Sequence, residues 1–299
     1  MRHNHTMPSW SRRARTARPA AALDVRDARG LPVGQIRDFC LQAPVEAALL
    51  GEHVEALGRF SFYGDQLWCL EDGESLRGLC WTGGNVVPYR IPPGGAELLA
   101  ERLRARRRRY SSIVGPAEDV LPLWALLEAD APPPRDVRAD QPSLTITGAP
   151  MVVPEERVRL SDRADMDVLL PACVAMFTEE VGYSPLDAGS GYERRVRTLV
   201  ESGRSLSWVA QTDHGREVIF KAELGTVALG VTQVQGVWVN PRYRGRGYGA
   251  TGMAAVVEYA QRHVAPVVSL YVNGYNSAAL AVYRKVGFTQ VGTFATVLF

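Results

Sequence analysis

Hydrophobic positions change period several times along the chain, and each change predicts a new element. Apolar runs bounded by glycine, proline or aspartate predict strands, whereas apolar residues three or four apart predict helices. The first half predicts, in order, a strand and a helix over 23–41 with a turn at 30–32, a helix over 44–58, strands over 61–71 and 75–84, a helix over 96–110, a strand over 111–115, a helix over 117–129, a breaker over 131–140 and a strand over 143–148.

A second series of similar order follows residue 156. It predicts a strand from 157, an N-cap at Ser161 with an amphipathic helix after it, a helix over 191–203, strands over 206–212, 216–223 and 226–240, a glycine-rich loop, a helix over 250–263, a strand over 267–273, a helix over 277–287 and a final strand over 291–299. Alternating strands and helices predict an α/β fold with mixed sheets. We therefore expect two domains of related plan, 21–147 and 155–299.

Length and charge narrow the classes of protein. The 299 residues suffice for two ordinary domains, and the formal net charge of +2 gives no global field toward nucleic acid or membrane. No apolar run approaches the ~20 residues that span a bilayer. We expect a cytoplasmic protein with no nucleic-acid or membrane partner. Residues 1–20 contain no acid and several arginines, which favours a disordered basic arm, with an organelle transit peptide as the alternative.

The four cysteines indicate no metal site. Cys40, Cys69, Cys80 and Cys173 form no C-x-x-C pair, and none has a histidine at metal-ligand spacing. We expect buried free thiols and no metal.

The segment RYRGRGYGA, residues 242–250, stands between a predicted strand and a predicted helix. Amides at a helix N-terminus are unpaired and favour anions. Gly245, Gly247 and Gly249 would let the backbone adopt positive φ and approach a ligand, so successive amides could hold a pyrophosphate. An ordinary arginine-glycine turn is the alternative. The segment lacks the Gly-Lys-Ser/Thr of a Walker A loop, and too little chain follows for a Rossmann domain.

Two linked motifs carry a family resemblance over residues 155–299. Arg244-x-x-Gly247-x-Gly249-Ala250 resembles the R/Q-x-x-G-x-G/A signature of the GCN5-related N-acetyltransferases (GNAT), and residues 276–288 are similar to that family's N-x-x-A-x-x-x-Y-x-x-x-G-F motif. The resemblance implies a GNAT fold and acetyl-CoA as co-substrate. The cofactor-binding residues it implies are Val237, Trp238, Val239, Arg244, Gly245, Arg246, Gly247, Tyr248, Gly249, Ala250 and Asn276. Residues 20–146 show neither motif, so we expect a degenerate GNAT-like domain there.

The reaction implied is direct attack of a primary amine on the thioester through a tetrahedral intermediate. The resemblance places Tyr283 near the sulfur, where a phenol of pKa ~10 could protonate the departing thiolate. A backbone amide of 237–239, Val239 first, could stabilise the oxyanion. Gln233 and Gln235 are expected on the same strand face as Val237 and Val239. Glutamine cannot serve as the base, so the candidates are Glu223, Glu179 and Glu180, with Glu223 preferred.

Two other functions remain open at this stage. Without an evident base, the protein could be a non-catalytic acyl-CoA-binding regulator. The arginine run 106–109 and the N-terminal arm could bind nucleic acid, although the near-zero charge argues against it. The acceptor, a small molecule or a protein, is not legible. It also stays open whether the N-terminal domain shapes the acceptor site or forms a homodimer contact.

Overall fold

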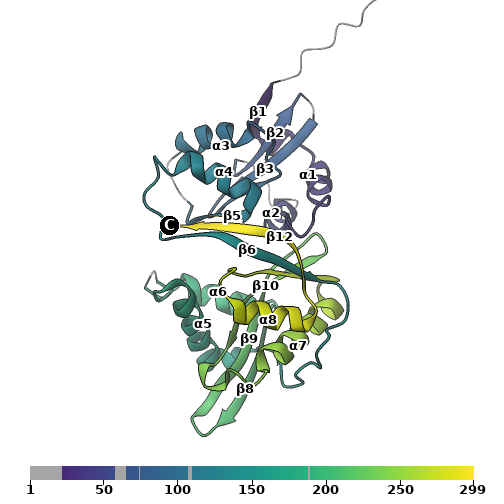
Figure 1. Cartoon of the computed structure of the whole chain (residues 1–299), viewed down its shortest axis with the longest axis vertical. Coiled ribbons are helices and arrows are strands. Elements are labelled where there is room, and N and C mark those ends of the chain that lie inside the picture. The colour runs from purple at the N-terminus through teal and green to yellow at the C-terminus, as the bar shows by residue number, and fades with distance from the viewer. Residues whose placement is uncertain (1–21, 58–64, 74, 107–109, 188) are drawn as a thin grey trace, which may run out of the picture.

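The computed structural model of the chain (Figure 1) describes residues 22–57, 65–73, 75–106, 110–187 and 189–299. The predicted basic arm at 1–20 and residues 107–109 of the arginine run lie outside the described residues. The elements of the first half are β1 (Leu23–Asp27), α1 (Val33–Cys40), α2 (Ala48–Leu57), β2 (Leu67–Asp72), β3 (Ser75–Thr82), β4 (Val86–Tyr89), α3 (Gly95–Arg104), β5 (Ser112–Pro116), α4 (Ala117–Leu127) and β6 (Asp136–Ile146).

The second half repeats this plan. Its elements are β7 (Arg159–Leu160), α5 (Met166–Val181), α6 (Gly191–Glu201), β8 (Ser205–Thr212), β9 (Gly215–Ala228), β10 (Val231–Val239), α7 (Tyr248–His263), β11 (Val267–Tyr271), α8 (Ser277–Val286) and β12 (Thr289–Leu298). The α/β class with a mixed sheet, expected from the sequence, is confirmed.

One sheet joins the halves in the order β1-β2-β3-β4-β5-β12-β6-β11-β10-β9-β8-β7. The last strand of each half is inserted beside the other half: β12 pairs with β5 and β6, and β6 pairs with β12 and β11. Figure 1 shows β12 and β6 side by side between an upper and a lower group of helices. Separating the halves would break the pairing of β12 with β5 and β6 and that of β6 with β11. The proposed division into domains 21–147 and 155–299 stays a prediction. It divides the sequence into two parts, but one sheet runs through both.

Helices cover both faces of each half. In the second half, α7 and α8 pack on one face around residues such as Phe220 and Val234, and α5 and α6 cover the other face around Val218 and Trp238. In the first half, α1 and α2 form one core and α3 and α4 the other. The four cysteines are buried and free, as expected.

The helix α2 also fixes the first half to the second. Gly51 lies against the tight turn between β9 and β10, where a Cβ built on Gly51 would stand 2.6 Å from Leu229 Cδ1. The Glu55 carboxylate accepts a hydrogen bond from the Leu229 amide at 3.0 Å, and Leu229 has φ +56. The turn that brings β10 toward the loop is therefore anchored by the other half.

Four local predictions were wrong. The segment 226–240 is not one strand, because Leu229 and Gly230, both at positive φ, turn the chain into a hairpin of β9 and β10. Ser161 does not cap a helix: its hydroxyl is buried with those of Ser205 and Ser207, and Asp162 caps the following 3-10 turn instead.

The other two errors concern strands. The predicted breaker at 131–140 ends earlier, because residues from 136 pair with β12. The strand β4 over 86–89 was missed, since its four residues include Pro88. Proline disfavours a strand assignment from sequence, but the residue's carbonyl can still take part in the ladder.

Candidate functional site: the loop before α7

The glycine loop leaves β10 and enters α7 through a single 3-10 turn at Pro241–Tyr243. Asn240 starts that turn, accepting from the Arg242 amide at 3.2 Å and donating to the Val218 carbonyl at 3.2 Å. Gly245 has φ +76 and Gly247, the N-cap of α7, has φ +84. A Cβ built on either would meet nothing within 4 Å. The backbone conformation therefore favours glycine at both positions, and the space beside them is open.

Gly249 has a different role. Its φ is ordinary for a helix, and a Cβ there would make van der Waals contact at 3.6 Å with Val239 and with Val282. Of the three glycines expected to adopt positive φ, only Gly245 and Gly247 do so. Gly249 and buried Ala250 instead allow α7 to lie close to β10 and α8.

The loop presents unpaired donors. Within the described residues, no hydrogen bond is found for the backbone amides of residues 245–249, while the Gly247 carbonyl accepts from Ala250 and Thr251. The guanidinium of Arg246 lies 5.3 Å from the Tyr243 ring centre, and within the described part of the chain it forms no salt bridge. Free amides at a helix N-terminus beside an unpaired cation are suited to a phosphate.

The strand β10 has a free edge near this loop. It pairs with β11 only at residues 231–233, and in the described structure its later residues pair only with β9. Irregularities interrupt the β10–β9 ladder twice, between Gln233 and Val234 and between Gln235 and Trp238, where Gly236 has φ +59. A bulge thus precedes Val237, Trp238 and Val239, and in the described structure their backbone has no strand partner on the β11 side.

The bulge also corrects an expectation about the glutamines. Gln235 pairs with Glu223 on the α5 face, whereas Val237 and Val239 pack into the core beneath α7 and α8. Gln233 and Gln235 are therefore not on the same face as Val237 and Val239. Simple alternation fails because a bulge adds a residue to one strand.

Glu179 connects the helix α5 with the loop. Its carboxylate accepts from Trp238 Nε1 at 3.2 Å and from Arg244 Nη2 at 2.6 Å, and Arg244 Nε donates to the Val239 carbonyl at 3.0 Å. Arg244 is thereby directed back to β10 and α5. The carboxylate of Glu179, one of the candidate bases, thus already accepts two hydrogen bonds.

Tyr283 and Asn276 lie on α8. Tyr283 is buried, with its ring 5.9 Å from that of Phe288, and its hydroxyl has no hydrogen-bond partner among the described residues. Burial raises the pKa of Tyr283, and the charge of Glu180 raises it further. The Asn276 side chain accepts from the Ala279 amide at 3.1 Å and so caps α8. That leaves the Asn276 side-chain NH₂ group as the donor toward a ligand.

Glu223 belongs to a buried polar cluster that the sequence did not reveal. Lys221 Nζ lies 2.6 Å from Glu223 Oε1, and Cys173 Sγ lies 3.6 Å from the same oxygen. Burial alone would raise the pKa of Glu223 and lower that of Lys221, but their opposite charges hold the pKa of Glu223 below its usual range and that of Lys221 above it. Burial raises the pKa of Cys173 to about 11.

A signal for this cluster was available in the sequence. Lys221 is one of only two lysines in the chain, and it stands two residues from Glu223 in the apolar run VIFKAEL. Residues two apart on a strand share a face, so a buried ion pair could have been anticipated. The Glu223 carboxylate also lies against the bulge, 3.0 to 3.1 Å from a Cβ built on Gly236.

The corresponding loop of the first half is closed. Gly94 caps α3 with φ +79, as Gly247 caps α7, but a Cβ on the next residue, Gly95, would stand 2.6 Å from Leu70. The amides of Arg90 and Ile91, just after β4, donate to the Asp119 carboxylate at 2.8 and 2.7 Å. A carboxylate of the first half therefore binds two backbone amides just before α3.

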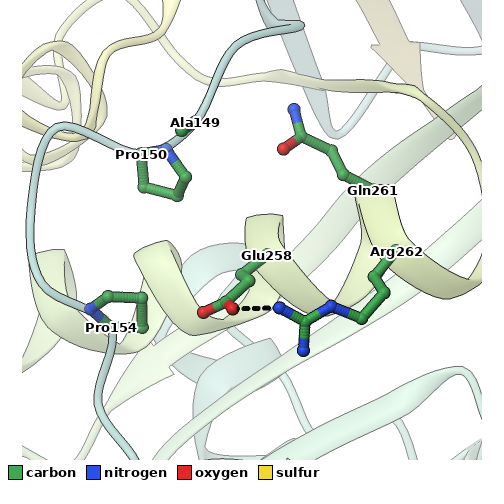
Figure 2. Close-up of a pocket in the computed structure, with 6 residues that line it drawn as sticks. All are labelled: Ala149, Pro150, Pro154, Glu258, Gln261 and Arg262. Atoms are coloured by element: carbon green, nitrogen blue, oxygen red, sulfur yellow. Dashed lines mark hydrogen bonds and ion pairs between the residues drawn. The ribbon is translucent and has the colours of Figure 1, made fainter.

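Two surface hollows lie away from this loop. The larger, about 590 Å³, lies between the segment 149–154 and the last turns of α7, where Glu258 pairs with Arg262 (Figure 2). The smaller, about 280 Å³, borders the same segment near Gly287. Neither hollow is lined by a predicted site residue.

Among the described residues, no three histidine, cysteine, aspartate or glutamate side chains are grouped so that they could hold a metal ion. No helix in that part of the chain combines the length and the apolar character that crossing a bilayer requires.

Comparison with known proteins extends the geometric picture. Residues 182–288 match the model of the acetyltransferase (GNAT) family, and residues 65–169 match a domain of unknown function, DUF4081. A 60-residue stretch, 20% of the chain, is 42% identical to the N-alpha-acetyltransferase RimI of Mycobacterium tuberculosis, and it covers 36% of that protein's length.

Solved structures show the fold over nearly the whole chain. A GCN5-related N-acetyltransferase from Sphaerobacter thermophilus has a TM-score of 0.55 at 18% identity, covering 92% of this chain and 95% of its own. A tandem GNAT protein from the clavulanic acid biosynthesis pathway has a TM-score of 0.50 at 17% identity, covering 93% and 98%. The chain therefore shares the fold of GNAT acetyltransferases, residues 182–288 match the model of that family, and a domain of unknown function precedes them.

Proposed function

We propose that the chain is an N-acetyltransferase that transfers the acetyl group of acetyl-CoA to a primary amine. The observation that carries the proposal is the open loop at 245–249, with free amides and the unpaired Arg246, directly beside the free edge of β10. The loop would hold the pyrophosphate, and the edge at Val237–Val239 would pair with the pantetheine arm. Asn276 would contribute its remaining side-chain donor.

In the proposed reaction, the amine nitrogen attacks the thioester carbonyl and the bond from carbon to sulfur breaks. A free amide in 237–239 would stabilise the oxyanion, because a fixed dipole needs no reorganisation during the reaction. The raised pKa of Tyr283 keeps its phenol protonated at neutral pH. It would therefore donate its proton to the departing sulfur, and the proton lost by the amine would then restore the phenol.

The proposed base, Glu223, sets a condition on the acceptor. Its pairing with Lys221 makes it a weak base. An α-amine of pKa ~8 costs only about 1 kcal/mol to deprotonate at pH 7, whereas a lysine of pKa ~10.4 costs roughly 4–5 kcal/mol. The site thus favours an amine of low pKa, as at a peptide N-terminus.

Calorimetry of acetyl-CoA binding tests the proposal, with Gly247→Asp as the main variant. The new carboxylate would stand where the phosphate binds, so affinity should fall by at least about tenfold. Gly247→Ala separates backbone strain from charge and should retain most of the affinity.

Gly94→Asp is the matched control. Gly94 is also an N-cap at positive φ with open space around it, yet it lies in the closed loop and should leave binding unchanged. Wild-type protein that does not bind, or binding equally sensitive to both aspartates, would refute the proposal. Binding without release of coenzyme A across a panel of amines would favour the non-catalytic alternative.

A further inference from the structure

Adjacent carboxylates end the helix α5, and each is tied to a different part of the molecule. Glu179 holds Trp238 and Arg244 on the side of the proposed cofactor site. Glu180 is bound by Arg138 of β6, the strand that comes from the first half of the chain. The last turn of α5 therefore lies between the loop and the inserted strand.

Arg138 is a buried guanidinium, and each of its three side-chain nitrogens donates a hydrogen bond. Its side chain is only 9% exposed, and it donates to Asp136 Oδ2 at 2.8 Å, to Glu180 Oε1 at 2.9 Å and to the Glu180 carbonyl at 3.1 Å. It thus fixes both the side chain and the backbone of Glu180. A cation also stabilises the carbonyls at a helix C-terminus.

Glu180 itself keeps capacity for another ligand. Half of its side chain is exposed, and within the described residues Oε2 has no hydrogen bond. Burial raises the pKa of Tyr271 on β11 and of Tyr283 on α8, and the charge of Glu180 adds to both, although Arg138 opposes it at Tyr271. Arg138 stands two residues before Asp140, whose carbonyl accepts from the Gly274 amide at 2.9 Å just after β11. Arg138 therefore places the Glu180 carboxylate near the end of β11, beyond the point where the pairing of β10 with β11 stops.

We infer that Glu180 binds the ammonium group of the acceptor and that Arg138 positions it, so that the first half of the chain contributes directly to the acceptor side of the second. This inference rests on the proposed function. The incoming amine binds as a cation at Glu180 Oε2 and gives one proton to the proposed base, Glu223, before it attacks. Arg138 touches neither substrate and acts only by holding Glu180.

Steady-state kinetics with Glu180→Gln tests the inference. The probes are glycinamide, an alanine-leading dipeptide, ethanolamine, glucosamine and Nα-acetyl-lysine amide, each followed by release of coenzyme A. Loss of a charge-assisted hydrogen bond should raise the KM for the best amine by at least about tenfold, while the Kd for acetyl-CoA stays within about twofold.

Glu201→Gln is the matched control, because Glu201 ends α6, is 40% exposed and pairs with Arg163 at the same 2.9 Å. It should change neither constant. Arg138→Lys should raise the amine KM by a smaller factor than Glu180→Gln, since one ammonium cannot make three directed contacts. Arg138→Lys keeps the positive charge, so the variant should still fold.

Three outcomes would overturn the inference. The first is an amine KM that is unchanged in Glu180→Gln. The second is an equal loss of affinity for amine and acetyl-CoA, which would indicate a merely structural role. The third is no transfer to any of the five amines by wild-type protein that binds acetyl-CoA. Failure to bind acetyl-CoA at all would refute the proposed function instead, so the two failures are distinguishable.

Discussion

The buried pair of Lys221 and Glu223 gives the sharpest test of the energetics. Lys221 is fully buried and Glu223 nearly so, with 2.6 Å between Nζ and Oε1. Lys221→Met would keep the volume and leave the carboxylate without a cation. Removing one partner of a buried pair costs roughly 3–5 kcal/mol. We therefore expect the free energy of unfolding to fall by that amount at pH 8.

The dependence on pH distinguishes this cause from lost packing. In the wild type, the lowered pKa of Glu223 gives stability that is present above the pKa of the unfolded glutamate and lost as pH falls through the folded one. The raised pKa of Lys221 gives stability that is present below the unfolded pKa and lost as pH rises through the folded one. Between about pH 5 and 9 the contribution of the pair is therefore constant.

In Lys221→Met the sign for Glu223 reverses. Burial without a cation raises its pKa, so the variant should be less destabilised at pH 5, where the carboxyl is protonated, than at pH 8. Urea denaturation at the two pH values measures this difference. Adding Glu223→Gln should recover at least about 1 kcal/mol at pH 8 and remove the pH dependence.

Arg197→Met is the control, because Arg197 and Glu193 form an exposed pair at 2.9 Å on α6. Such pairs contribute at most about 0.5 kcal/mol. If Lys221→Met differed from this control by less than about 1 kcal/mol and showed no pH dependence, the argument from charge burial would be refuted.

Three further predictions concern other parts of the molecule. Burial raises the pKa of Asp119 to about 6, above its unfolded value. Its contribution to stability is therefore present at low pH and lost as pH rises through about 6, so Asp119→Asn should flatten the pH dependence of urea midpoints measured from pH 4 to 7. An unchanged slope would contradict this. Tyr283→Phe should lower kcat for coenzyme A release by about 10²–10⁴-fold without moving the thermal midpoint, because the hydroxyl has no described partner; retained kcat would exclude Tyr283 as the acid. Gly252→Ala should cost about 1–3 kcal/mol in urea denaturation, because its Cβ would stand 2.7 Å from the Phe220 ring, whereas Gly34→Ala on α1 has nothing within 4 Å and should cost nothing.

Local patterns predicted most elements, because hydrophobic period and turn residues act over a few neighbours. Strands β2 and β3 and helices α3, α4, α6, α7 and α8 all overlap their predicted ranges. The predictions failed where a distant partner decided the outcome. Residues 136–140 look like a breaker until β12 pairs with them, and the alternation in β10 fails at a bulge set against β9.

The sequence by itself determined that residues 242–250 form a glycine loop before a helix, because the glycine spacing fixes the backbone there. The family motifs could also be identified from the sequence, since each consists of residues at fixed spacing along the chain. Only the tertiary structure decided which residues meet. It exchanges β6 and β12 between the halves, ties Glu179 to Arg244, seals Glu223 with Lys221 and brings Arg138 to Glu180 across 42 residues. Contacts of this kind depend on how strands are ordered in the sheet, and no local pattern in the chain encodes that order.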